Sequence, residues 1–364
     1  WLTEHRKPFG VITCAGKYRT GKSFLLNRLA NARSGAGFGV GNTVQACTKG
    51  LWVYKKWFKT DDPDKDVLFM DTEGIDALDA NDTHDVRVFT LALLLSSAFL
   101  YNSVGAIDET AMQTLSLMTH VTNNVKVQSN TEDVDIKSLS EHMPAFFWIL
   151  RDFSLRLVDK DGSPLTADEY LENALQTSDP QKDQVRGAIR GAFQQRKLVT
   201  LPRPTNDDAN MTLLENRLRS VSPKFTKEID HLRKSLFHTI RPFTARGKVA
   251  TGRMYGALCT HLASVVQSDA VPVMRDSWTL MAAVQAKDLK DNCLVEFEEL
   301  LAKQPKQRPA QVDAALVAIH RQMMDRFDDR ALPPIDVETR EALDKSRTKK
   351  PTLLSGSHRK DGFQ

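Results

Sequence analysis

Cysteine is scarce in this 364-residue chain, and the four cysteines are far apart in the sequence. Cys14, Cys47, Cys259 and Cys293 form no CxxC pair and show no Cys/His spacing typical of zinc ligands. The pattern argues against a disulfide framework and a zinc module. It predicts free thiols in a reducing compartment, and therefore a cytoplasmic protein.

Long apolar runs and a strong net charge are missing too. The most apolar segment, residues 88–101, is interrupted by three hydroxyl side chains and is shorter than the roughly 20 residues that a membrane-spanning helix needs. A buried helix that continues into a core strand explains this segment better. The formal net charge is only +4, too weakly basic to favour nucleic acid as a partner.

The length of the chain exceeds the usual size of one hydrophobic core and predicts a large domain followed by a second. Strand-like and helix-like stretches alternate as far as Pro223, which predicts an α/β fold with a mostly parallel sheet covered on both faces by helices. The expected strands are residues 11–15, 67–70, 146–150 and 198–201, and the expected helices include residues 23–32, 109–124 and 182–195.

Beyond Pro223 we expect no strands, and residues 224–237 and 254–266 are predicted to form helices. From residue 269 the chain is expected to be entirely helical, because apolar residues recur at the spacing of one packed helix face. These residues are Val312, Ala315, Leu316, Ile319 and Met323. The Val271-Pro272 break places the predicted boundary near Ser268, so that residues 1–268 form the first domain and residues 269–364 begin an all-α domain.

A glycine-rich segment between the first expected strand and helix fits the phosphate-loop pattern G-x-x-x-x-G-K-S. Its glycines allow successive backbone N–H groups to surround the phosphates of a nucleotide. Lys22 is expected to reach the β- and γ-phosphate oxygens, and the Ser23 hydroxyl to bind Mg²⁺. The predicted nucleotide contacts of this segment are Gly16, Lys17, Tyr18, Arg19, Thr20, Gly21, Lys22, Ser23 and Phe24. We therefore expect the chain to bind a nucleoside triphosphate.

Two further segments are suited to the phosphates and the metal. Asp71, at the end of an apolar strand, can bind a water of the Mg²⁺ shell, and the N–H of Gly74 can meet the γ-phosphate. The polar loop before Leu51 offers a threonine that completes the Mg²⁺ shell. Thr48 is the preferred residue and Thr43 its rival, because either hydroxyl could instead cap a turn or a helix.

The Asn-Lys-x-Asp motif of guanine-specific switches is absent, and a different pair offers a base-reading group. Arg151 and Asp152 follow the apolar strand at residues 146–150. The Asp152 carboxylate could accept the N1–H and 2-amino hydrogens of guanine, whereas adenine would leave a buried carboxylate unpaired. The alternative interpretation is an ordinary surface ion pair between these two residues.

Together, the segments G-K-Y-R-T-G-K-S, T-V-Q-A-C-T-K-G-L-W, D-T-E-G, L-L-S-S-A-F-L-Y-N-S and L-R-D-F-S-L closely resemble the guanylate-binding proteins, which are large dynamin-related GTPases. The resemblance covers nearly the whole chain and fades after Ser268; atlastins share the Arg-Asp pair. It implies a GTPase head and a helical stalk, with GTP as substrate and Mg²⁺ as cofactor. It also implies a homodimer formed across the nucleotide faces, faster hydrolysis when paired, and assembly or recruitment to membranes.

The same resemblance assigns roles to individual residues. Arg19 would be an internal arginine finger, although it could instead pair with a loop carboxylate. Glu73 would join a catalytic network, Arg203 would cover the guanine, and Asp85 would lie in a phosphate-cap loop. The implied catalytic residues are Arg19, Lys22, Thr48 and Glu73, and the implied metal ligands are Ser23, Thr48 and Asp71.

Three positions depart from what hydrolysis usually requires. Ala46 stands where family members generally have a serine, Cys47 where many have a histidine, and Ile75 where small GTPases have a glutamine. Two hypotheses therefore remain. One is a dimerising GTPase, with GDP or GMP as the final product, and the other is a GTP-gated scaffold that scarcely hydrolyses.

Overall fold

The computed structural model of the protein describes residues 1–33, 37–39, 50–74, 83–115, 140, 143–206, 221–245, 247–268, 272–303, 309–333, 335 and 337–346. The chain divides into two compact units. The first contains residues 1, 5–244 and 259–275, and the second contains residues 2–4, 245–258 and 276–364. The boundary that the sequence places near Ser268 stays a prediction.

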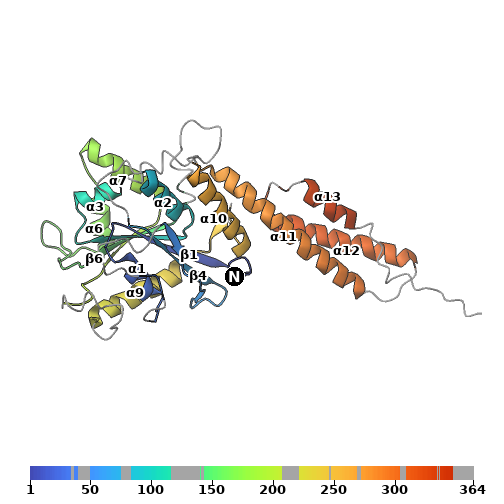
Figure 1. The fold of residues 1–364 in the computed structure, drawn as a ribbon, viewed down its shortest axis with the longest axis horizontal. Coiled ribbons are helices and arrows are strands. Elements are labelled where there is room, and N and C mark those ends of the chain that lie inside the picture. Colours follow the sequence, from blue (N-terminus) through green and yellow to red (C-terminus); the bar gives the residue numbers. More distant parts are fainter. Residues whose placement is uncertain are drawn as a thin grey trace, which may run out of the picture. The chain divides into compact units, whose positions relative to one another are not determined.

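A seven-stranded sheet forms the centre of the first unit (Figure 1). Its strands are β1 (Phe9–Ala15), β2 (Leu51–Val53), β3 (Phe58–Lys59), β4 (Asp66–Thr72), β5 (Ala98–Val104), β6 (Ala145–Arg151) and β7 (Arg196–Thr200). The order is β2-β4-β1-β5-β6-β7, and β3 pairs with β4. β1, β4, β5, β6 and β7 are parallel, while β2 and β3 run antiparallel to β4. The mostly parallel sheet predicted from the sequence is confirmed.

The central strands are apolar along almost their whole length because both of their faces are covered. Every residue of β1 and β4 is buried. Such unbroken apolar runs are typical of parallel strands between two layers of helices. β4 pairs with one edge of β1, and β5, the next strand along the chain, pairs with the opposite edge. The strand order therefore reverses at β1. Ligands of open α/β sheets bind at the carboxyl edge beside such a point.

Helices pack on both faces of the sheet (Figure 1). On one face, α1 (Lys22–Leu29) and α9 (Pro223–Thr239) join a core cluster with Ile12 of β1 and Phe69 of β4. On the other face, α2 (Thr83–Leu94) brings Phe89 against Phe99. Phe193, the residue after α7 (Pro180–Ala192), packs against Phe146. The predicted helix-to-strand reading of residues 88–101 is confirmed by α2 and β5. Aromatic packing fixes the sheet between its two helical layers.

Two shorter helices also belong to this unit. α6 (Ala167–Ala174) begins at a capping box, in which the Thr166 hydroxyl accepts from the Glu169 N–H while the Glu169 side chain accepts from the Thr166 N–H. α3 (Glu109–Thr114) is capped at its start by the Asp108 side chain, which accepts from the Ala111 N–H. Of the helix predicted over residues 109–124, residues 109–114 are helical. Leu115 caps α3, and residues 116–139 lie outside the described part of the chain.

Strands do not stop at Pro223, so that prediction was wrong. β8 (Thr244–Ala245) and β9 (Lys248–Val249) form a two-stranded sheet. Gly247, with φ at 78°, makes the turn beside them. Strands of two residues contain no alternation of apolar and polar side chains, so no periodic pattern in the sequence indicates them.

Helices make up the described remainder: α10 (Gly252–Gln267), α11 (Met274–Ala302), α12 (Pro309–Arg330) and α13 (Val337–Lys345). Leu316, Ile319 and Met323 of the predicted apolar stripe are buried in a cluster with Phe297 and Leu343. The helical reading of this region is confirmed for the described residues. No helix among them is long and apolar enough to cross a bilayer.

Candidate nucleotide-binding site

The predicted phosphate loop joins β1 to α1 at the carboxyl edge of the sheet. Gly16 has a φ of 149°, and a Cβ there would lie 2.1 Å from the carbonyl oxygen of Asn102 on β5. Gly21, the residue before α1, has a φ of 79°. Both glycines are needed, because one lies against a neighbouring backbone and both adopt conformations that side chains disfavour.

Hydrogen bonds hold the loop from within and from the sheet. The Thr20 hydroxyl donates to the Lys17 carbonyl at 2.8 Å. The Asn102 amide donates to the Thr20 carbonyl at 2.9 Å, and Nη1 of Arg151 donates to the Gly21 carbonyl at 3.3 Å. The N-cap residue of α1 is Gly21, which has no side chain that could cap the first turn. A preformed loop that leads through a glycine N-cap into a helix N-terminus is suited to an anion such as a phosphate.

Lys22 is a buried ammonium beside this loop. Its Nζ lies 3.4 Å from the Lys17 carbonyl, and the residue is 7% exposed. Burial lowers the pKa of Lys22, and the Asp71 carboxylate opposes that shift. A buried cation is stabilised by a bound anion, so Lys22 is placed for the role that the motif predicts.

Ser23 and Asp71 meet although 48 positions separate them. The Ser23 hydroxyl donates to Oδ2 of Asp71 at 2.5 Å, and Asp71 is fully buried. The pairing of β1 with β4 brings them together, since Cys14 lies opposite Asp71 in the register. A hydroxyl beside a carboxylate is a donor set that fits Mg²⁺, which prefers oxygen ligands.

Glu73 joins three segments just beyond β4. Its Oε2 accepts from the Gly50 N–H at 2.7 Å, and the Glu73 N–H donates to the Gly50 carbonyl at 2.8 Å. Nε2 of His84, on α2, lies 3.0 Å from the same carboxylate oxygen. The sequence gives no sign of His84, because the start of α2 lies beside the end of β4 only in the folded chain.

Gly74 packs directly on the phosphate loop. A Cβ at this position would lie 2.5 Å from the Cα of Tyr18. The glycine is therefore required by the close approach of two backbones. The segment that was predicted to contact the γ-phosphate touches the loop that was predicted to surround the phosphates.

The Arg151-Asp152 pair lies at the end of β6, on the same edge of the sheet. Asp152 is half-buried and has a φ of 56°, which is uncommon for a residue other than glycine. Arg151 is buried and stacks over the rings of Phe24 and Phe225. This burial is unlike the ordinary surface ion pair that was the alternative interpretation.

The remaining predicted residues differ in their surroundings. Arg19 is exposed and has a φ of 62°, and Arg203 is exposed beyond β7. The side chain of Phe24 lies in the core and stacks on Phe225. Asp85 lies in the first turn of α2. The predicted residues Thr48 and Thr43, and the departures at Ala46, Cys47 and Ile75, lie outside the described residues.

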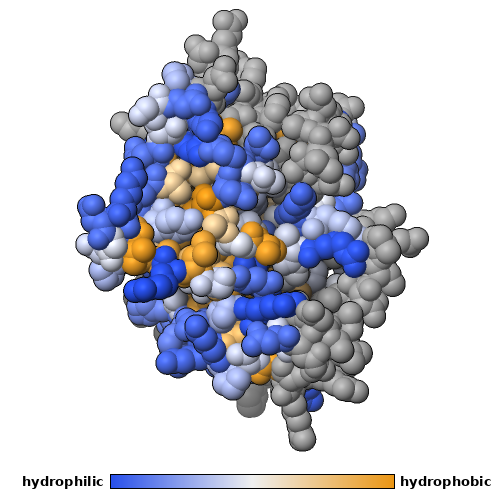
Figure 2. Space-filling view, turned by 90° about the vertical axis from the view of Figure 1, so that its left-hand side faces the viewer, coloured by the Kyte–Doolittle hydropathy of each residue, from blue (hydrophilic) through white to orange (hydrophobic). Residues whose placement is uncertain are grey.

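One face of the molecule gathers apolar surface near its middle, and polar surface surrounds much of it (Figure 2). Among the large hydrophobic residues that remain exposed are Val104 at the end of β5 and Leu155 in the loop beyond β6. Val104 pairs in register with Arg151. Exposed apolar side chains therefore lie near the carboxyl edge of the sheet, where the predicted base-reading pair is found.

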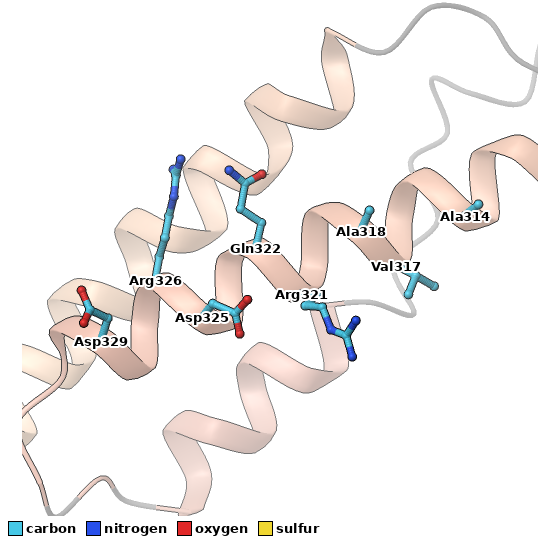
Figure 3. A pocket seen from close by; sticks show the side chains of 8 residues that line it. All are labelled: Ala314, Val317, Ala318, Arg321, Gln322, Asp325, Arg326 and Asp329. Carbon is cyan, nitrogen blue, oxygen red and sulfur yellow. The ribbon is translucent and has the colours of Figure 1, made fainter.

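A shallow hollow of about 600 Å³ lies along α12 in the second unit (Figure 3). It is lined by Ala314, Val317, Ala318, Arg321, Gln322, Asp325, Arg326 and Asp329. All eight are exposed residues of one helix, and Arg326 forms an ion pair with Glu296 at 2.8 Å. None of the residues that line the hollow is a glycine or a buried titratable group.

Comparison with known proteins gives consistent matches. A family model described as "Guanylate-binding protein, N-terminal domain" matches residues 2–242. Guanylate-binding protein 4 of Homo sapiens is 33% identical over 315 residues, which cover 83% of this chain and 49% of that protein. Guanylate-binding protein 3 of Mus musculus is 32% identical over 331 residues, covering 88% of this chain and 53% of that protein. Guanylate-binding protein 6 of Homo sapiens is 34% identical over 293 residues, covering 77% of this chain and 46% of that protein. The chain spans about half the length of these curated relatives.

Proposed function

The chain belongs to the guanylate-binding protein family, and from this premise we propose that it binds GTP and hydrolyses it to GDP. The observation that carries the proposal is the bond between Ser23 and the buried Asp71. It joins the two phosphate motifs across neighbouring strands, at the edge where nucleotides bind in this class of fold. Spacing in the sequence alone does not require such a contact.

In this proposal each group at the sheet edge has one task. Lys22 binds the β- and γ-phosphate oxygens, and the N–H groups of the loop surround the phosphates. A Mg²⁺ ion held by Ser23 and, through water, by Asp71 would neutralise charge on the same oxygens. Asp152 accepts the N1–H and 2-amino hydrogens of guanine, and the exposed Arg203 covers the base.

Glu73 is proposed to orient the attacking water together with Thr48. Its carboxylate is held by Gly50 and His84 and is 23% exposed, so water can reach it. Such orientation fixes the nucleophile in line with the γ-phosphate, which is how phosphoryl-transfer enzymes gain most of their rate.

Arg19 is proposed to act as an arginine finger when two heads pair across their nucleotide faces. Its exposed position in the loop and its left-handed backbone support this role, since only the side chain must turn to reach the phosphates. Such a group contributes about 10³- to 10⁵-fold in rate. Arg19→Ala should therefore lower the stimulated rate while leaving GTP affinity nearly unchanged. A parallel loss of binding would refute the finger role.

A second candidate is a GTP-gated scaffold with little hydrolysis. Ala46 favours it, because this position lacks the serine hydroxyl found in most of the family. In that case the nucleotide state would change the affinity for a partner or a membrane without rapid turnover. Continuation of hydrolysis from GDP to GMP belongs to the first candidate only.

The test is GTP turnover per molecule over a wide range of protein concentrations, with GDP and GMP separated. A specific rate that rises with concentration supports hydrolysis activated by dimerisation. A flat rate near zero, with GTP affinity retained, supports the scaffold. Absence of binding to any guanine nucleotide would contradict both candidates.

A further inference from the structure

Arg151 is buried directly beneath the phosphate loop. The residue is 5% exposed, and its Nη1 donates to the carbonyl oxygen of Gly21 at 3.3 Å. Its guanidinium carbon lies 5.8 Å from the ring centroid of Phe24 and 5.5 Å from that of Phe225. Both distances are within the range of a cation–π contact. The guanidinium is therefore held by aromatic rings of α1 and α9 while it contacts the loop.

The loop is shaped to this guanidinium. A Cβ at Gly21 would lie 3.3 Å from Nη1 of Arg151, so the backbone approaches the side chain closely. On the neighbouring strand, Asn102 donates to the preceding carbonyl, that of Thr20. The Gly21 carbonyl also accepts from the Leu25 N–H in the first turn of α1, at 2.9 Å. Two successive carbonyls of the loop are thus contacted by side chains of β5 and β6.

Fixing these carbonyls also fixes the direction of the next N–H groups. In a trans peptide the carbonyl and the following N–H point in opposite directions within one plane. The carbonyls of Thr20 and Gly21 point toward Asn102 and Arg151, so the N–H groups of Gly21 and Lys22 point away from them. Successive N–H groups oriented in this way form a concave site for an anion.

We propose that Arg151 is a positioning residue for the phosphate loop and that base recognition is left to Asp152. The proposal rests on the proposed binding of GTP. The two adjacent residues then divide the work: the arginine orients the N–H groups that meet the phosphates, and the aspartate reads guanine. Burial lowers the pKa of Arg151 and the Asp152 carboxylate opposes this, while arginine remains cationic at physiological pH.

The substitution Arg151→Lys tests this division. Lysine keeps the charge but loses the planar fork that reaches the Gly21 carbonyl while stacking on two rings. We expect the dissociation constants of GDP and GTPγS to rise about tenfold, and that of GMP to change less than the other two. The preference for GDP over ADP, measured by competition, should stay as in the wild type. Binding is measured without hydrolysis, by titration.

Two variants serve as controls. Arg196→Lys changes another partly buried arginine, on β7, whose bonds go to Glu172, Arg190 and Phe193 and not to the loop. It should leave all three dissociation constants unchanged. Asp152→Asn should give the converse result, with the preference for guanine reduced and the dependence on the number of phosphates retained.

The outcomes separate the alternatives. If Arg151→Lys weakens the binding of GMP, GDP and GTPγS equally and removes the preference for guanine, Arg151 reads the base and the proposal is overturned. Unchanged binding overturns it as well. If the variant melts early, Phe225→Leu replaces it, because this change removes one ring beneath the guanidinium and should give the same phosphate-dependent pattern more weakly. A wild-type protein that binds no guanine nucleotide would contradict the proposed function itself.

Discussion

Removing the imidazole of His84 should slow GTP hydrolysis and leave GTP binding nearly unchanged. Oε2 of Glu73 accepts two hydrogen bonds, from the Gly50 N–H at 2.7 Å and from Nε2 of His84 at 3.0 Å. His84→Ala removes one of them. Without it the carboxylate is held less firmly, so it spends less time in the orientation that positions the attacking water.

The size of the effect follows from exposure. A hydrogen bond to a charged group contributes about 1.5–3 kcal/mol. The His84 side chain is 56% exposed and that of Glu73 is 23% exposed, so water replaces part of the lost contact. We therefore expect a loss of about 1 kcal/mol in transition-state stabilisation, or about fivefold in rate.

Single-turnover hydrolysis at saturating GTP measures the rate, and titration with GTPγS measures binding. His231→Ala is the matched control, because His231 is an exposed histidine of α9 that faces Glu228 at 3.9 Å. His84→Gln should recover part of the rate, since an amide can donate to the same oxygen. The reasoning is refuted if His84→Ala hydrolyses GTP at the wild-type rate, or if affinity falls by as much as the rate.

Three further predictions concern other parts of the first unit. Burial against Trp57, with ring centroids 3.6 Å apart, lowers the pKa of His5 below its usual 6.5 although Asp66 opposes the shift. Below pH 6.5 the unfolded chain therefore binds more protons than the folded chain, so the melting temperature should fall on acidification. The fall should be less steep in His5→Gln than in the wild type, and equal slopes of melting temperature against pH in the two proteins would contradict this. Gly74→Ala brings a methyl group into the Tyr18 backbone, and overpacking of about 1–3 kcal/mol should weaken GTPγS binding at least fivefold by titration. Asp152→Asn should lower the preference for GDP over ADP about tenfold in competition, and an unchanged preference would remove Asp152 from base reading.

Most of the sheet was predictable because parallel strands covered on both faces are continuously apolar. Residues 146–150 are an example, and they form β6 with one added residue at each end. The antiparallel partners of β4 were not predictable in this way. β2 and β3 contain three and two residues, so neither shows a period, and their pairing depends on contacts distant in the sequence.

The residues of the site likewise fall into a predictable and an unpredictable group. The phosphate loop and Asp71 are recognisable because each contact group lies within a few residues of its neighbours and directly after a strand. Asn102 and His84 carry no such local signal. Asn102 reaches Thr20 across 82 positions only because β1 and β5 pair, and a polar residue inside an apolar strand usually indicates nothing more than local packing. The burial of Arg151 likewise depends on α9, which starts more than 70 positions later in the chain.

Arg19 and Asp152 have left-handed backbone conformations, which lower the stability of the fold at positions proposed to serve the binding site. Such a conformation costs an L-residue about 1–2 kcal/mol, whereas glycine adopts it without strain and loses only about 0.5–1 kcal/mol to its greater freedom when unfolded. Both residues nevertheless carry the charged side chains proposed for catalysis and base recognition. Directed evolution for heat resistance alone would therefore favour glycine at positions 19 and 152, and it would yield a sturdier protein that has lost discrimination and rate. Libraries built on this scaffold need a nucleotide-dependent selection alongside the thermal one.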